Sequence, residues 1–349
     1  MSRSLSLLLL AILFSSFASA ETGFRQLRLN EHRERPLDVT VWYPTAEDGK
    51  PALVGENIVF NGTPALPDAK PAAGKHPLLL ISHGYGGNWR NLNWLAYQMA
   101  MQGYIVAAVD HPGTTTRNKN EHAAQQLWQR PRDLVQLMDY LLATPEVAGH
   151  VDEQRIAAVG HSLGGWTVMS LAGARFSAAK FLADCKNHAA LGGCKLTHIL
   201  GIDKPASASP LAADRRDPRV KAVVSLDLGL ARGFTPESLH NVTIPVLVMA
   251  AQADSDDVPA QLESGYLADS LPANTRQWVS VNGATHFSFM QECKAGAEAL
   301  IDAQAPGEGI VCRDGGTLSR TAIHQQLFSH ISHFLNQALD YHPSYGGNP

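Results

Sequence analysis

The sequence lacks several features that mark common classes of protein, and each absence narrows the possible functions. Its 28 basic residues do not exceed its 32 acidic ones, and a net charge of −4 offers no basic face for nucleic acid. It contains no C-x-x-C pair and no H-E-x-x-H motif, which argues against zinc sites and thioredoxin-like redox chemistry. It also contains no internal repeat or low-complexity tract, which argues against a repeat architecture.

After residue 20 no apolar run is long enough to span a membrane. The chain begins Met1-Ser2-Arg3-Ser4, an apolar run follows over 5–17, and Ala18-Ser19-Ala20 ends the segment. This pattern predicts a signal peptide over residues 1–20, because the run is too short for a comfortable membrane span. No cysteine precedes Cys185, so lipoprotein anchoring is not available. We therefore expect an exported protein, periplasmic or secreted, with no stable membrane anchor.

The four cysteines are few, but their even number predicts disulfides in an exported protein. Three pairings are possible. Nearest-neighbour pairing, Cys185 with Cys194 and Cys293 with Cys312, closes two short loops that otherwise have little support. Each bond would add about 2–3 kcal/mol to the free energy of unfolding in the loop-entropy model.

Apolar strands and amphipathic helices alternate along most of the chain. After an outer strand at 37–44, strands are predicted at 77–82, 104–109, 155–159, 220–226, 245–250 and 275–281. Helices are predicted at about 91–101, 133–142 and 262–270, after the strand at 155–159, and around Ile323 to Leu335. This alternation predicts an α/β fold, with a mostly parallel central sheet flanked by helices.

Three stretches depart from the alternation. Residues 45–75 are rich in Pro, Gly and Ala and predict a surface excursion, and residues 114–127 predict a polar loop. Residues 175–218 contain two cysteines and a Gly-Gly pair, and they predict a small inserted cap region. With 45% hydrophobic residues the chain can bury a substantial core, so we expect one domain over 21–349.

A glycine-flanked serine stands between a predicted strand and a predicted helix. The stretch is Gly160-His161-Ser162-Leu163-Gly164, which has the G-x-S-x-G pattern of a nucleophile elbow. A strained strand-to-helix turn would present the Ser162 hydroxyl at the carboxyl edge of the sheet. Ser162 is therefore the candidate nucleophile.

A nucleophilic serine needs a base and an orienting carboxylate. His286 follows the strand at 275–281 through a short turn, so it lies at the same sheet edge as Ser162 and is the candidate base. Three acidic residues follow neighbouring strands. Asp254 is favoured, and Asp227 and Asp256 are the alternatives.

An acyl-transfer site also needs two N–H groups to hold the developing oxyanion. Leu163, directly after the serine, supplies one candidate. Tyr85, in the glycine-rich turn His83-Gly84-Tyr85-Gly86 after the strand at 77–82, supplies the other.

These motifs resemble the α/β-hydrolase superfamily over nearly the whole chain after residue 20. More narrowly, the chain is similar to bacterial dienelactone-hydrolase-like proteins related to platelet-activating-factor acetylhydrolases and to polyester-degrading cutinases. The matching segments are Val41-Trp42-Tyr43-Pro44, Ser82 to Gly87, Asp110-His111-Pro112-Gly113, Gly160 to Gly165 and Gly283 to Phe289.

The resemblance implies an α/β-hydrolase fold and a serine carboxylic-ester hydrolase that uses Ser162, His286 and an acid. The cutinase pattern assigns the acid to Asp254, whereas the acetylhydrolase pattern assigns it to Asp227. Dienelactone hydrolases proper use a cysteine nucleophile, and here that position is serine.

We therefore expect hydrolysis of a small-molecule ester or lipid through an acyl-enzyme, with no cofactor and no metal. A lipase or peptidase with the same triad, and a binding protein that keeps the fold without turnover, are the alternatives. The natural substrate and the oligomeric state are left open by the sequence.

Overall fold

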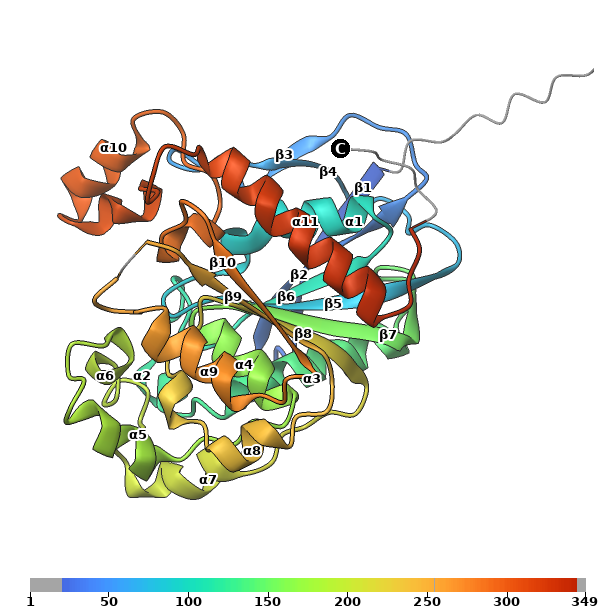
Figure 1. Ribbon diagram of the computed structural model, residues 1–349. Helices are drawn as coiled ribbons and strands as arrows, with labels where there is room; N and C mark the ends of the chain where they lie inside the picture. Colours follow the sequence, from blue (N-terminus) through green and yellow to red (C-terminus); the bar gives the residue numbers. More distant parts are fainter. Residues whose placement is uncertain (1–20, 254, 344–349) are drawn as a thin grey trace, which may run out of the picture.

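The computed structural model of the protein describes residues 21–253 and 255–343, so the predicted signal peptide, 1–20, lies outside the described residues. A ten-stranded sheet runs through the middle of the molecule, with helices on both faces (Figure 1). The spatial order of its strands is β10-β9-β8-β7-β5-β6-β2-β1-β4-β3.

The strands from β5 onward form the parallel part of the sheet. They are β5 (Lys75–Ser82), β6 (Ile105–Asp110), β7 (His150–His161), β8 (Val220–Leu226), β9 (Val246–Ala251) and β10 (Arg276–Val281). All neighbours in this group pair in parallel. Each overlaps the strand predicted from its apolar run, and β5, β6 and β9 are buried along nearly their whole length because both of their faces are covered. Their carboxyl ends consequently lie at one edge of the sheet.

The first four strands extend the sheet on the other side. They are β1 (Glu21–Leu29), β2 (Leu37–Thr45), β3 (Ala52–Val54) and β4 (Thr63–Pro67). β2 pairs antiparallel with both β6 and β1. The predicted excursion at 45–75 therefore contributes two short strands, β3 and β4, which the Pro- and Gly-rich composition concealed.

Two faces of the sheet are covered by different helices (Figure 1). On one face lie α1 (Asn93–Met101), preceded by the 3₁₀ helix η1 (Trp89–Leu92), and α11 (Arg320–Ala338). On the other lie α3 (Gln129–Ala143), α4 (Leu163–Leu171) and α9 (Tyr266–Ser270), the last preceded by a π-helical turn, η4 (Gln261–Gly265). The predicted loop at 114–127 holds one further short helix, α2 (Glu121–Ala124).

The remaining helices are shorter and lie in the segments that connect these elements. In the predicted cap region they are α5 (Ala178–Cys185), α6 (Gly192–Lys195), η2 (Pro205–Ser207) and α7 (Ala208–Ala212). Elsewhere they are η3 (Ala231–Gly233), α8 (Pro236–His240), η5 (His286–Phe289), α10 (Ala297–Gln304) and η6 (Glu308–Cys312). Within the described part of the chain, no helix has both the length and the apolar character that crossing a bilayer requires.

Polar contacts fasten the predicted cap region, residues 175–218, to the rest of the molecule. Asp184 pairs with Arg232 at 2.5 Å, and the Gly192 N–H donates to the Asp257 carbonyl over 2.8 Å. Asp257 belongs to the loop after β9. The cap therefore lies against loops from the carboxyl ends of β8 and β9.

Disulfides join Cys185 to Cys194 in the cap and Cys293 to Cys312 around α10. Replacing either pair with alanine should lower the free energy of unfolding by about 3 kcal/mol, because the unfolded chain regains loop entropy. The loss should be slightly larger for the second pair, which is separated by 19 residues rather than 9. Urea unfolding of the two double variants measures both effects, and midpoints equal to wild type would contradict the prediction.

Candidate active site

Ser162 lies at a sharp turn between β7 and α4. Its backbone has φ 56° and ψ −122°, a strained conformation for a residue with a side chain. A Cβ on Gly160 would lie 2.0 Å from the Gly164 carbonyl oxygen, and a Cβ on Gly164 would lie 1.9 Å from that of Ser82. Both positions therefore require glycine, and the turn leaves Ser162 partly exposed at the carboxyl end of β7.

His286 reaches Ser162 from a segment 124 residues later in the chain. It begins η5, just after the turn that follows β10. Its Nε2 lies 3.1 Å from Ser162 Oγ. Its backbone carbonyl accepts a 2.8 Å hydrogen bond from Nε2 of His161, the residue before the serine. The nucleophile elbow thus contacts His286 twice: His161 binds its main chain, and Ser162 faces its ring.

Asp227 provides the carboxylate on the other side of this imidazole. Its Oδ2 lies 2.6 Å from Nδ1 of His286, and its side chain is only 1% exposed. Its second oxygen, Oδ1, accepts a 2.8 Å hydrogen bond from the Ala251 N–H at the end of β9. Because β8 lies between β7 and β9, this residue can bridge the nucleophile strand and the histidine loop.

The sequence favours Asp254 as the acid, whereas the carboxylate at Nδ1 in the structure is that of Asp227. Asp254 lies outside the described residues. Asp256, the third candidate, is exposed in the loop after β9. The difference arises because Asp227 directly follows the strand beside β7 and is held by the end of β9, a contact that residue order does not reveal.

The two candidate oxyanion donors border Ser162. Leu163 is the first residue of α4, and Tyr85 lies in the turn after β5 with 41% of its surface exposed. Neither backbone N–H has a hydrogen-bond partner among the described residues. A Cβ on Gly84 would lie 3.1 Å from Ser162 Cβ, so glycine there allows the turn to approach the serine.

The arrangement of Ser162, His286 and Asp227 can transfer a proton. The imidazole can accept the hydroxyl proton at Nε2 while the carboxylate holds its Nδ1–H. Across residues 21–253 and 255–343, no cluster of three or more His, Cys, Asp or Glu side chains has the geometry of a metal site.

The buried charged residues beside the site were missed by the sequence reasoning. Arg130 and Asp133 are both fully buried on α3, at spacings that continue its apolar stripe of Leu134, Leu137 and Met138. The signal available in the sequence was that these two charged residues fall on the apolar face of the helix. Charged residues are rarely buried without a partner, so their position indicates a buried polar network.

Glu263 is a second buried acid near the site. It lies in η4, and its two oxygens accept hydrogen bonds from the Leu230 and Ala231 N–H groups, at 3.2 and 2.7 Å. These residues follow Asp227 by a few positions, so Glu263 anchors the loop that Asp227 begins. Burial raises the pKa of the Glu263 carboxyl from its ordinary value of 4.5 to about 8.

The raised pKa of Glu263 predicts a pH-dependent contribution to stability. Since the folded state binds a proton that the unfolded state releases above about pH 4.5, this stability is complete below that pH and is lost as pH rises toward 8. The loss amounts to at most about 1.4 kcal/mol per pH unit.

Glu263→Gln, which cannot ionise, should remove this slope in urea unfolding between pH 5 and 8. Glu153→Gln, at an exposed position, is the control. A Glu263→Gln profile parallel to that of wild type would refute the prediction.

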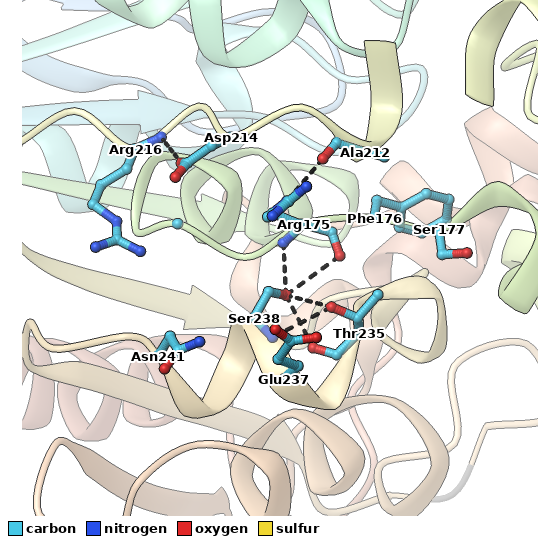
Figure 2. A pocket seen from close by; sticks show the side chains of 11 residues that line it. Arg175, Phe176, Ser177, Ala212, Asp214, Arg216, Thr235, Glu237, Ser238 and Asn241 are labelled. Carbon is cyan, nitrogen blue, oxygen red and sulfur yellow. Dashed lines mark hydrogen bonds between the residues drawn. The ribbon is translucent and has the colours of Figure 1, made fainter. Parts of the chain in front are cut away.

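A cavity of about 530 Å³ is lined by residues from 173–177, 212–216 and 235–241 (Figure 2). Its lining includes Arg175, whose Nε donates to the Ala212 carbonyl, and Arg216, whose N–H donates to Asp214. Ser162, Asp227 and His286 are not among the residues that line it. The cavity is therefore separate from the site just described, which lies at the carboxyl ends of β7 and β8.

Comparison with known proteins identifies similar sequences. A family model described as "PETase: PET hydrolase-like" matches residues 61–190. Cutinase est1 of Thermobifida alba is 25% identical over 217 residues, covering 60% of this chain and 53% of the cutinase. Bis(hydroxyethyl) terephthalate hydrolase of Streptomyces coelicolor is 25% identical over 231 residues, covering 66% of this chain and 56% of that protein. The match thus spans about half the length of these relatives.

A solved structure matches almost the whole chain. Ferulic acid esterase from Streptomyces cinnamoneus superposes with a TM-score of 0.64, covering 96% of this chain and 95% of the esterase at 21% sequence identity. At this identity the likeness establishes the fold alone. The predicted fold and the predicted resemblance to cutinases are both confirmed: the chain has an α/β-hydrolase fold and is similar to PET hydrolase-like proteins over residues 61–190.

Proposed function

We propose that the protein is an exported serine hydrolase that cleaves carboxylic esters through an acyl-enzyme intermediate. One observation carries the proposal: His286 lies within hydrogen-bond distance of Ser162 Oγ at one ring nitrogen and of Asp227 Oδ2 at the other. This is the arrangement that makes an unreactive hydroxyl nucleophilic. The similar proteins lend support, since their names include cutinase, bis(hydroxyethyl) terephthalate hydrolase and ferulic acid esterase.

The reaction proceeds in two halves. His286 Nε2 takes the proton of Ser162 Oγ as that oxygen attacks the ester carbonyl, and Asp227 stabilises the resulting imidazolium. The Leu163 and Tyr85 N–H groups hold the oxyanion. The tetrahedral intermediate expels the alcohol, which takes the proton from Nε2. Water then attacks the acyl-enzyme and passes its proton to His286. The second tetrahedral intermediate collapses to the free acid as Nε2 returns that proton to Ser162 Oγ.

The assignment can be tested with the purified protein, a fluorophosphonate probe and a panel of substrates. We expect stoichiometric labelling of Ser162, located by mass spectrometry of the labelled peptide, and none after heat unfolding. The panel contains p-nitrophenyl esters of increasing acyl length, bis(hydroxyethyl) terephthalate, ethyl ferulate and a peptide amide. Hydrolysis of the esters, with no hydrolysis of the peptide amide, supports the proposal. Labelling of another serine, or no ester hydrolysis, would refute it.

Export is supported by the apolar segment at 5–17 and by the two disulfides, which persist in oxidising compartments. Expression of the full sequence in a bacterial host followed by cell fractionation tests it. We expect protein whose first residue is Glu21 in the periplasm or medium. Protein that keeps residues 1–20 in the cytoplasm would refute export without affecting the proposed chemistry.

A further inference from the structure

Arg130 is a fully buried arginine in the first turn of α3, and its donors are spread over three segments around the candidate site. Its Nη2 donates to the His83 carbonyl and, over 3.2 Å, to Ser82 Oγ. Its Nη1 donates to Thr114 Oγ1 over 2.6 Å, and its Nε to Thr167 Oγ1 over 2.9 Å. We propose that Arg130 is a positioning residue that holds the two halves of the oxyanion hole together. This inference rests on the proposed function.

The first half of the hole is the turn after β5. Arg130 holds the His83 carbonyl, and His83 Nδ1 donates a 2.6 Å hydrogen bond to the carbonyl of Gly84. The Gly84 carbonyl and the Tyr85 N–H belong to one planar trans peptide, so they point in opposite directions. Fixing the Gly84 oxygen therefore fixes the direction of the Tyr85 N–H, the candidate donor.

The tautomer that this geometry needs is imposed by the surrounding groups. His83 Nε2 accepts a 3.0 Å hydrogen bond from the His111 N–H, which assigns the ring proton to Nδ1. Burial, together with the nearby Arg130 guanidinium, lowers the pKa of His83 well below its ordinary value. The imidazole therefore stays neutral, and its only N–H is available to the Gly84 carbonyl.

The second half of the hole is the first turn of α4. Thr167 accepts a hydrogen bond from Arg130 Nε and donates from Oγ1 to the Leu163 carbonyl over 3.0 Å. This contact braces the residue whose N–H is the other candidate donor. The guanidinium thus joins the turn after β5 to the nucleophile helix, two segments separated by about eighty residues in the sequence.

The Asp133 carboxylate is linked to Arg130 through two neutral side chains, those of His111 and Ser82. Ser82 Oγ lies 2.9 Å from His111 Nε2, and His111 Nδ1 lies 2.9 Å from Asp133 Oδ2. Asp133 also forms two hydrogen bonds with Arg35, at 2.7 and 2.8 Å. Within residues 21–253 and 255–343, no hydrogen bond of Arg130 goes to a carboxylate, and every acceptor is a hydroxyl or carbonyl in a segment beside the site. Because a buried charge is costly, this distribution favours a role in holding those segments over simple packing.

The test compares Arg130→Met and Arg130→Lys with wild type. It measures kcat and KM for a p-nitrophenyl ester, the affinity for an alkylboronic acid that forms a tetrahedral adduct at Ser162, and Tm. For Arg130→Met we expect kcat to fall about 10- to 100-fold, because one displaced donor loses part of its effect on the oxyanion. KM should change less than about threefold, since the hole acts mainly on the transition state. Boronate affinity should fall in step with kcat, and Arg130→Lys should give an intermediate loss.

Arg155→Gln is the matched control for general destabilisation. Arg155 donates to the carbonyls of Leu339 and Asp340 and pairs with Asp152, near the opposite end of β7 from Ser162. Its loss should lower Tm while leaving kcat and boronate affinity within about twofold of wild type, because no contact to the site changes.

A second variant keeps the inference testable if Arg130→Met does not fold. Thr167→Val preserves the shape of the side chain but removes the link from Arg130 to the Leu163 carbonyl, and it should lower kcat about fivefold. Folded Arg130 variants with wild-type kcat and boronate affinity would overturn the inference, as would wild-type kcat in Thr167→Val. An inactive wild-type enzyme that the fluorophosphonate does not label would instead overturn the proposed function.

Discussion

Replacing Ser162 with alanine is expected to lower kcat for p-nitrophenyl esters by about 10⁴- to 10⁶-fold and to abolish fluorophosphonate labelling. The reason is chemical: without Oγ there is no atom for His286 to activate at 3.1 Å and no acyl-enzyme can form. The elbow itself should persist, because its shape depends on the glycines at 160 and 164. Circular dichroism and Tm close to wild type would separate this chemical loss from unfolding.

The matched control is Ser170→Ala, on the same helix. Ser170 Oγ donates to the Trp166 carbonyl and is buried, yet it lies two helical turns beyond the nucleophile. Its removal should leave kcat within about twofold, since it touches no reacting atom. If Ser162→Ala retained most of the esterase activity, the nucleophile would have to be another residue.

Replacing Asp227 with asparagine is the second change with a large expected effect. Both carboxylate oxygens accept hydrogen bonds, Oδ2 from His286 Nδ1 at 2.6 Å and Oδ1 from the Ala251 N–H at 2.8 Å. An amide has only one oxygen, so its NH₂ must face one of these two donors. If it faces His286, the ring proton moves to Nε2 and the base cannot accept the serine proton. We expect kcat to fall about 10³- to 10⁴-fold with little change in KM.

The neighbouring acids provide the controls for this prediction. Asp256→Asn, at an exposed position, and Asp254→Asn should each leave kcat within about threefold of wild type. The comparison also decides between the two family patterns. A large loss in Asp254→Asn together with normal activity in Asp227→Asn would reassign the acid to Asp254.

The order of the parallel strands, and of the main helices that cover them, could be predicted from residue types alone. Apolar runs such as 77–82 and 245–250 coincide with β5 and β9, because strands buried on both faces need no polar positions. The stripe at 134–141 coincides with α3 for the equivalent reason in a helix. The short strands β3 and β4 were hidden, because a few paired residues among prolines leave no periodic pattern.

Some residues of the candidate site could likewise be predicted from the sequence, whereas others required the tertiary structure. Ser162 could be singled out because close backbone contacts at positions 160 and 164 exclude any side chain, and glycine is visible in a sequence. His286 could be singled out because it follows the last parallel strand. The choice of carboxylate needed tertiary structure, because acids follow both β8 and β9 and only spatial contact distinguishes them. Arg130 needed it too, since its partners come from β5, the loop after β6 and α4, which the chain brings together only on folding.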